Sequence, residues 1–176
     1  MKASELDAIL VIARSAAREA AALARQGFRR HPAVEHKGAV DLVTQFDRDS
    51  ETLLRARLGA AFSFDIVGEE QGGSWNPATP AFFIDPIDGT TNFVHGHPFW
   101  CVSIGLVVGG VETLGVVVAP MLGLEWSGWI ADDGERKALR NETEPCVVSA
   151  MARFEDSLLA TGFPYRRFSR TEAWNR

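Results

Sequence analysis

Apolar residues near the N-terminus recur at three- and four-residue steps, which is the period of a helix that buries one face. This pattern predicts a helix over about residues 4–30, with Ser4 as its N-cap. Its apolar stripe is rich in alanine, which indicates close packing in a core rather than a cofactor site. A second helix is predicted over about residues 47–61, where Thr44 and Asp47 have the spacing of a capping box.

Short apolar runs bounded by glycine and proline follow the second helix and predict β-strands. They lie at residues 64–67, 81–84, 99–108 and 113–119, and a tight glycine turn joins the last two. Past residue 120 the pattern weakens to a polar loop or hairpin tip at 132–145, a strand at 146–148 and a helical turn at 154–159. Because helices and strands are mixed without regular alternation, we predict an α+β fold with a largely antiparallel sheet.

Composition and charge narrow the class of protein. The 176 residues carry a net charge of −5, with 46% hydrophobic and 23% charged residues, which is ordinary for a globular protein and argues against nucleic-acid binding. Acids near the N-terminus and Glu112 within the longest apolar stretch lead us to expect neither a signal peptide nor contact with a membrane. The two cysteines, Cys101 and Cys146, are far apart, so we expect reduced, half-buried thiols in a cytoplasmic protein.

Acidic residues follow two of the predicted strands. Glu69 and Glu70 come after the strand at 64–67, and Asp85 and Asp88 come after the strand at 81–84. If these strands are neighbours, the acids converge, and carboxylate and carbonyl oxygens are the ligands that Mg²⁺ prefers. Three carboxylates together would repel one another unless a cation neutralised them. We expect Pro86 to fix a turn in which Asp85 and Asp88 point to the same side.

A segment suited to binding an anion follows these acids at once. Gly89 allows close approach to the backbone, and Thr90 and Thr91 open a short predicted helix whose free N–H groups would face a phosphate. Either acidic motif alone is more often a turn or a solvated edge, but both occur directly after strands. His95 and His97 are read as ordinary loop histidines, because magnesium rarely takes imidazole.

Residues 85–93, DPIDGTTNF, carry a specific resemblance. The chain resembles the inositol monophosphatase family of lithium-sensitive, magnesium-dependent phosphatases, whose first signature this segment matches residue for residue. Further matching segments are DLVT at 41–44, GEE at 68–70, HG at 95–96, VSIGL at 102–106 and ATGFP at 160–164. The resemblance therefore runs from the first helix to about residue 165 and implies a layered α/β sandwich of the inositol monophosphatase and sugar phosphatase type.

The resemblance implies two or three Mg²⁺ ions and a role for each matching residue. Glu69, Asp85 and the carbonyl of Ile87 would hold the first ion, and Asp85 with Asp88 a second. Asp47 and Thr90 would form a hydrogen-bonded pair that orients the attacking water, and Glu69 would help to deprotonate it. Asp88, Gly89 and Thr90 would bind substrate, with the Gly89 and Thr90 amides on the phosphate. Glu70, as an outer metal contact, and Lys37, at the mouth of the site, are additional candidates.

The family's second signature, Trp-Asp followed by small residues, has no match in this chain, where Trp174 is followed by Asn175. Its Asp would complete the second metal site. We therefore expect an N-terminal domain over residues 1–165 that carries the metal site, and the start of a truncated C-terminal part or polar tail at 166–176. The C-terminal α/β part would be missing, which leaves open whether the chain is a fragment, and whether it is active alone.

The resemblance implies a phosphomonoesterase that hydrolyses myo-inositol monophosphate by attack of a Mg²⁺-activated water. Two alternatives stay open. The substrate could be histidinol phosphate, a sugar bisphosphate or a nucleotide phosphate, or the chain could be a non-catalytic homologue that acts as a binding or regulatory protein. The expected partner is a small phosphorylated metabolite, and a homodimer is expected only by analogy.

Overall fold

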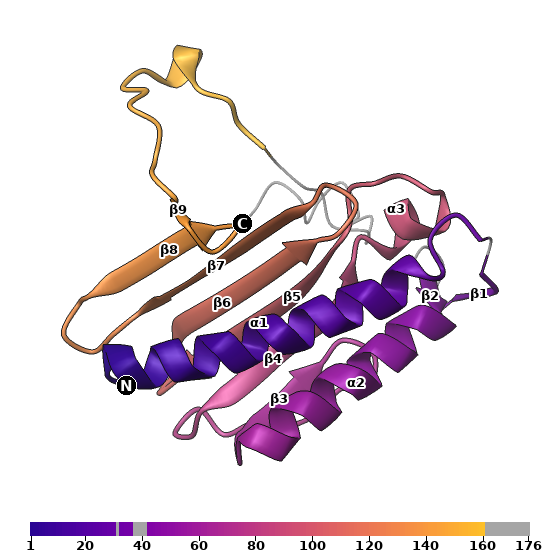
Figure 1. Cartoon of the computed structure of the whole chain (residues 1–176), viewed down its shortest axis with the longest axis horizontal. Helices are drawn as coiled ribbons and strands as arrows, with labels where there is room; N and C mark the ends of the chain where they lie inside the picture. The colour runs from indigo at the N-terminus through magenta and orange to yellow at the C-terminus, as the bar shows by residue number, and fades with distance from the viewer. Residues whose placement is uncertain (31, 37–41, 161–176) are drawn as a thin grey trace, which may run out of the picture.

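The structure is a computed structural model that describes residues 1–30, 32–36 and 42–160. Two long helices, α1 (Ala3–Arg25) and α2 (Gln45–Ala61), lie side by side on one face of a seven-stranded sheet (Figure 1). The sheet runs in the order β3 (Asp65–Gly68), β4 (Ala81–Asp88), β5 (Cys101–Val108), β6 (Val111–Ala119), β7 (Leu124–Ile130), β8 (Arg136–Arg140) and β9 (Glu144–Pro145). A small antiparallel pair, β1 (Val34–His36) and β2 (Leu42–Thr44), precedes α2. This arrangement confirms the predicted α+β fold.

Helix α1 begins earlier and ends earlier than predicted. Lys2, not Ser4, is the N-cap, and its backbone N–H donates to the Glu5 carboxylate at 2.8 Å. The helix ends at Arg25, because Phe28 packs in a second apolar cluster with Phe93 and Trp100. The centroid of the Phe28 ring lies 6.0 Å from that of Phe93 and 5.9 Å from that of Trp100. The helical period of the sequence continues past Arg25, but packing of this aromatic ring decides where the helix stops.

Helix α2 confirms the predicted capping box. Thr44 is the N-cap and accepts from the Phe46 N–H at 3.2 Å, and the Asp47 carboxylate accepts from the Thr44 N–H at 2.8 Å. The helix therefore starts at Gln45, two positions before the predicted start. Its buried face carries the polar residues Asp47, Ser50 and Glu51 beside Leu54 and Leu58, so one end of that face is available for polar contacts.

Strand β3 runs parallel to β4, whereas the other neighbouring strands of the sheet pair antiparallel. A largely antiparallel sheet is therefore confirmed. Strand β4 does not end before Asp85 as predicted but continues to Asp88, with a register shift against β5 between Asp85 and Asp88. Pro86 lacks the N–H that a ladder needs, so the strand bulges here instead of forming the predicted turn.

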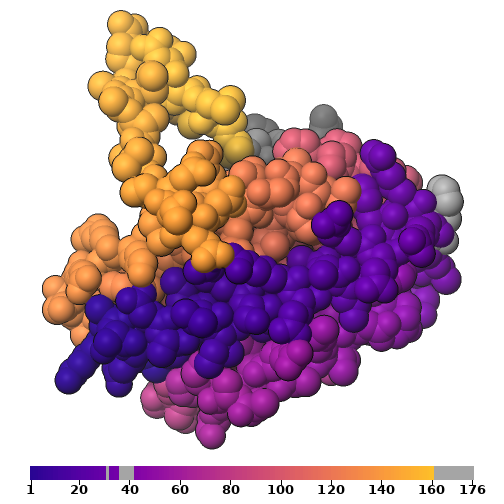
Figure 2. All heavy atoms as spheres, viewed as in Figure 1, coloured from indigo at the N-terminus to yellow at the C-terminus, as the bar shows by residue number. Residues whose placement is uncertain are grey.

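The polar region after β7 contains more β-structure than its sequence pattern predicted. Residues 136–140, predicted as loop or hairpin tip, form β8 against β7, and Gly128 permits this close pairing because a Cβ there would lie 2.3 Å from the Lys137 carbonyl oxygen. Residues 146–148 form no strand, which corrects that prediction, and the predicted helical turn is a 3-10 helix at Phe154–Asp156. Figure 2 shows that this segment projects away from the body of the molecule.

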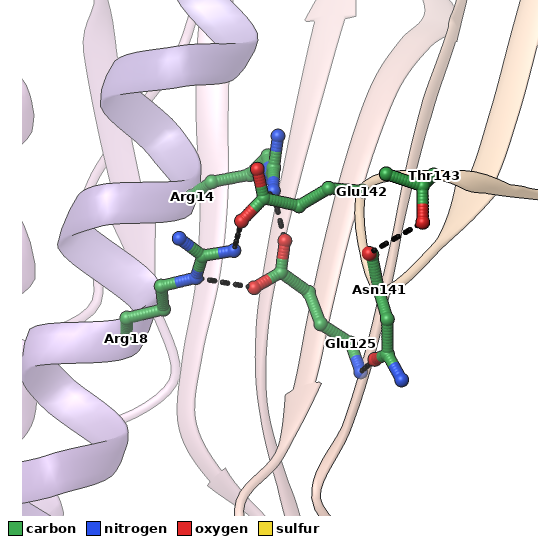
Figure 3. Close-up of polar contacts among 6 residues, drawn as sticks. All are labelled: Arg14, Arg18, Glu125, Asn141, Glu142 and Thr143. Carbon is green, nitrogen blue, oxygen red and sulfur yellow. Dashed lines mark hydrogen bonds and ion pairs between the residues drawn. The ribbon is translucent and has the colours of Figure 1, made fainter.

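The main core lies between the sheet and the two long helices, α1 and α2. Alternate residues of the central strands point toward the helices, and small alanine side chains let α1 approach them closely. Ion pairs add to this contact: Glu125 of β7, which is 6% exposed, accepts from Arg14 and from Arg18 Nε at 2.6 Å (Figure 3). Among the helices of the described residues, none is both long enough and apolar enough to cross a bilayer.

Candidate active site

The parallel pairing of β3 and β4 brings the two acidic motifs together. Gly68, the last residue of β3, is in register with Ile84 of β4, so Glu69 and Asp85 follow this pair on adjacent strands. The Glu69 N–H donates to the Ile84 carbonyl at 3.2 Å, which extends the ladder by one residue. The sequence could predict this convergence only on the condition that the two strands are neighbours.

Asp85 interacts with both of the other carboxyl groups of the acidic group, which consists of Glu69, Asp85 and Asp88. Its Oδ1 accepts from the Ile87 N–H at 3.1 Å. Burial, followed by the negative charge of Glu69, a hydrogen bond with the Glu69 side chain and the charge of Asp88, raises the pKa of Asp85 to about 8. The three carboxyl groups are therefore close enough to disfavour full ionisation unless positive charge is supplied.

Asp88 ends β4 and is exposed, and its Oδ2 accepts from the Cys101 thiol with the sulfur at 3.6 Å. Burial of Cys101 and the charge of Asp88 raise the pKa of this thiol to about 12. Cys101 is half-buried as predicted, whereas Cys146 is exposed, which corrects the prediction for that residue; both are free thiols.

A divalent cation fits this acidic group in chemistry, though the side chains are not gathered around one point. Within the described part of the chain, no three His, Cys, Asp or Glu side chains form a ready metal-binding group. Asp85 instead shares a hydrogen bond with Glu69, and Asp88 contacts Cys101. Carboxylates beside the Ile87 carbonyl are a hard oxygen donor set, and a bound cation would offset the repulsion among the charges of Glu69, Asp85 and Asp88.

The segment after Asp88 forms the predicted short helix, α3 (Thr90–Val94). Gly89 precedes it with φ +95°, a left-handed conformation that glycine adopts without strain. A Cβ at this position would lie 3.1 Å from the Phe99 carbonyl oxygen, so the close approach of the following loop also favours glycine. The Gly89 and Thr90 amides thus belong to a tight turn directly beside Asp88.

Asp47 and Thr90 come from α2 and α3 and meet through a hydrogen bond. Asp47 is 1% exposed, and its Oδ1 accepts from the Thr90 hydroxyl at 3.1 Å, while Oδ2 accepts from the Thr44 hydroxyl at 2.6 Å. Burial raises the pKa of Asp47, and the hydrogen bonds from Thr44 and Thr90 oppose that rise. The Thr44 cap thereby holds the Asp47 carboxylate in one orientation.

The Thr90 oxygen also lies 3.0 Å from the Ile87 carbonyl oxygen. A hydroxyl has one hydrogen, so Thr90 donates either to Asp47 or to Ile87 at any moment, and its lone pairs stay available to another donor. Thr90 therefore links the buried Asp47 to the backbone of the segment that carries Asp85 and Asp88.

Other candidates are placed less centrally. Glu70 is half-buried, and its backbone N–H donates to Glu51 at 2.7 Å. His95 and His97 are exposed beside α3, and the His97 ring stacks on Phe99 at 5.2 Å. Lys37 and the segment 166–176 lie outside the described residues.

The sequence patterns did not reveal Glu51 and Arg55 of α2. Glu51 is fully buried and forms an ion pair with Arg55 one helical turn later, at 2.8 Å. The available signal was the spacing of Asp47, Glu51 and Arg55, which puts all three on one helix face at four-residue steps. The same spacing is common on a solvated helix, so only its burial distinguishes the Glu51–Arg55 pair from an ordinary surface ion pair.

Known proteins of one family are similar to this chain over most of its length. A family model described as the inositol monophosphatase family matches residues 5–174. Inositol monophosphatase 3 of Solanum lycopersicum is 39% identical over 161 residues, which are 89% of this chain and 58% of that protein. The Nus factor SuhB of Pseudomonas aeruginosa is 38% identical over 164 residues, 90% of this chain and 59% of that protein.

Solved structures are similar over much of the same region. The extragenic suppressor protein suhB from Bartonella henselae has a TM-score of 0.73 at 31% identity, covering 83% of this chain and 56% of its own. An IMPase from Thermotoga maritima has a TM-score of 0.70 at 30% identity, covering 84% and 54%. The chain thus spans less than two thirds of the length of these relatives, and it belongs to the inositol monophosphatase family.

Proposed function

We propose that the protein is a magnesium-dependent phosphomonoesterase and that its substrate is a small phosphorylated metabolite, myo-inositol monophosphate. The observation that carries the proposal is the placement of the Asp47–Thr90 pair, joined at 3.1 Å, beside the segment that holds Asp85, Asp88 and the Gly89 turn. A buried acid bonded to a half-buried hydroxyl, next to an acidic group and an amide turn, is an arrangement suited to metal-assisted attack of water on a phosphate.

Glu69, Asp85, Asp88 and the Ile87 carbonyl would hold the Mg²⁺ ions, with Glu70 as an outer contact. When bound, the ions would polarise the phosphate oxygens and lower the pKa of the attacking water. The Gly89 and Thr90 amides would bind the phosphate oxygens. The proposal includes two or three ions.

The proposed path of the proton starts at the hydrogen bond between Thr90 and Asp47. Thr90 donates to Asp47 and can then accept from the attacking water through a lone pair. Glu69 takes up the proton as the water oxygen bonds to phosphorus and the bond from phosphorus to the ester oxygen breaks. The leaving alkoxide takes a proton from solvent water and Glu69 returns its proton to solvent, so the products are the free alcohol and inorganic phosphate.

The test is phosphate release from myo-inositol 1-phosphate with Mg²⁺, compared with histidinol phosphate, fructose 1,6-bisphosphate and adenosine 3′,5′-bisphosphate. We expect release from the inositol ester to exceed release from the others, to require Mg²⁺ and to fall with added Li⁺. Glu69→Gln should abolish it, whereas Glu112→Gln, at an exposed position at the start of β6, should leave it unchanged. Absence of Mg²⁺-dependent release from all four esters would refute the proposal.

A second candidate is a binding or regulatory role without catalysis. It is favoured by the similarity to a relative named as a Nus factor, at 38% identity. This candidate predicts a folded protein that binds Mn²⁺ or Mg²⁺ but releases no phosphate from any of the four esters. A homodimer and a cytoplasmic site of action belong to the proposal too, and light scattering in solution tests the first.

A further inference from the structure

The fully buried carboxylate of Glu51 faces the turn that carries Glu69. Its Oε2 accepts from the Glu70 N–H at 2.7 Å, and its Oε1 accepts from the Gln71 N–H at 3.1 Å. Oε1 also accepts from Arg55 Nε at 2.8 Å. One carboxylate therefore receives three donors, two of which are consecutive backbone amides of the turn.

Arg55 completes the contact from the same face of α2. Its Nη1 donates to the Ile66 carbonyl at 3.0 Å, and its Nη2 donates to the Gly72 carbonyl. These two carbonyls lie before and after the turn, so the planar guanidinium spans its base. The positive charge also compensates the buried Glu51 carboxylate, which would be costly to bury alone.

The remaining amides of the turn are fixed by its neighbours. The Gly68 N–H donates to the Gly72 carbonyl at 2.8 Å, and the Glu69 N–H donates to the Ile84 carbonyl at 3.2 Å. Consecutive N–H groups from Gly68 to Gln71 thus all have acceptors, and Glu69 stands in the middle of them. Because Ile84 precedes Asp85, the same bonds set the position of Glu69 relative to Asp85.

The sequence of β3 accommodates this contact at Gly68. A Cβ on Gly68 would lie 2.1 Å from Glu51 Oε1, which is far inside van der Waals contact. Glycine at this position therefore lets the carboxylate reach the amides beyond it. Helix α2 thereby holds both sides of the proposed site: Asp47 contacts Thr90, and Glu51, one turn later, contacts the Glu69 turn.

We propose that Glu51 and Arg55 are positioning residues that hold the Glu69–Gln71 turn in the geometry required for divalent-cation binding. The inference rests on the proposed function, because it treats Glu69 as a ligand of the cation. Neither residue would touch the cation or the substrate. Their effect would pass through the backbone of the turn, as outer contacts of metal ligands commonly act, and their removal would cost about 10- to 100-fold in metal affinity.

The test compares Arg55→Gln with Arg57→Gln, two variants of one helix that each lose an ion pair. Arg57 pairs with Glu19 of α1 at 2.6 Å and makes no bond to the turn among the contacts of the described residues. Mn²⁺ affinity is measured by titration calorimetry well below the unfolding temperature. Amide hydrogen exchange at residues 70 and 71 is measured on the same samples without metal.

We expect Arg55→Gln and Glu51→Gln to weaken Mn²⁺ binding about 10- to 100-fold and to speed exchange at residues 70 and 71, with neither effect in Arg57→Gln. A purely structural role would lower the unfolding temperature but leave the Mn²⁺ affinity of the folded protein unchanged, and that result would overturn the inference. If Glu51→Gln does not fold, Arg55→Lys, which keeps the charge but loses the planar fork, must show the same two changes or the inference fails.

The two levels of proposal fail differently. If the unsubstituted protein binds no Mn²⁺, the proposed function is refuted and this inference with it. If it binds Mn²⁺ and the Glu51 and Arg55 variants bind equally well, only the inference is refuted. Hydrogen exchange reports on the turn in both cases, because it needs neither metal nor substrate.

Discussion

The Thr90 hydroxyl oxygen lies 3.1 Å from Asp47 Oδ1, although the two residues are 43 positions apart in the chain. Asp47 is itself held by the Thr44 N–H and hydroxyl at the start of α2. The cap of one helix therefore orients an acid toward the first residue of another. This arrangement gives the Thr90 side chain a specific partner that a solvated threonine would lack.

Thr90→Val removes that hydroxyl at nearly constant volume. We expect phosphate release to fall about 100-fold or more, because the proposed water contact is lost, while stability falls by only about 1 kcal/mol for one hydrogen bond. Steady-state kinetics and urea unfolding measure the two effects. Thr91→Val, at the next and exposed position of α3, is the control and should change neither. A Thr90→Val protein with an unaltered rate would contradict the assigned role.

The raised pKa of Asp85 predicts a pH dependence of stability in metal-free protein. With a pKa of about 8 in the folded chain against an ordinary value of 3.8, Asp85 keeps a proton that the unfolded chain has lost between these pH values. The resulting stability is fully present below about pH 3.8 and is lost as the pH rises toward 8. We expect Asp85→Asn, which is neutral at every pH, to flatten this decline.

Thermal unfolding in EDTA between pH 5 and pH 8 measures that difference. Asp49→Asn, an exposed position of α2, is the control and should follow the unsubstituted protein. Added Mg²⁺ should raise the unfolding temperature of the unsubstituted protein but not of Asp85→Asn, because binding to the folded state alone stabilises it. Equal pH dependence in the two proteins would show that Asp85 is not the group responsible.

The two cysteines should differ in reactivity. The thiolate is the reactive form, and burial with the charge of Asp88 raises the pKa of Cys101 to about 12, so little thiolate is present at pH 8. Cys146 is exposed. Iodoacetamide should therefore modify Cys146 much faster, as followed by mass spectrometry of the single-cysteine variants Cys101→Ser and Cys146→Ser. Similar rates for the two thiols would contradict the described placement of Cys101.

The ion pairs that join α1 to β7 predict that loss of the buried Glu125 carboxylate lowers the free energy of unfolding substantially. Glu125→Gln leaves Arg14, whose side chain is 13% exposed, without one of its two charge partners (Figure 3), and we expect a loss of about 3 kcal/mol. Glu19→Gln breaks the more exposed pair with Arg57 and should cost less than about 1 kcal/mol. Urea unfolding of both variants tests the contrast, and equal losses would show that burial does not set the strength of these pairs.

Local sequence patterns were sufficient to predict the two long helices, the capping box of α2 and the hairpin of β5 and β6. Each depends on residues close in sequence, such as Thr44 with Asp47, whose side-chain chemistry is satisfied within one turn. The predicted ends of helices and strands were wrong where contacts between residues far apart in the sequence decide them. Phe28 leaves the helical path to meet Phe93 and Trp100, and Pro86 bends a strand that continues through its pairing with β5.

The sequence by itself identified Asp85, Asp88 and Gly89 as site candidates, and it identified the family. A signature of nine consecutive residues, 85–93, carries that information locally. Tertiary structure alone decided that β3 lies parallel to β4, which places Glu69 beside Asp85. It also decided that Glu51 and Arg55 face the Glu69 turn rather than solvent. Their four-residue spacing is the same on an exposed helix, and only the packing of α2 against the sheet removes water and converts an ordinary ion pair into a contact with the proposed site.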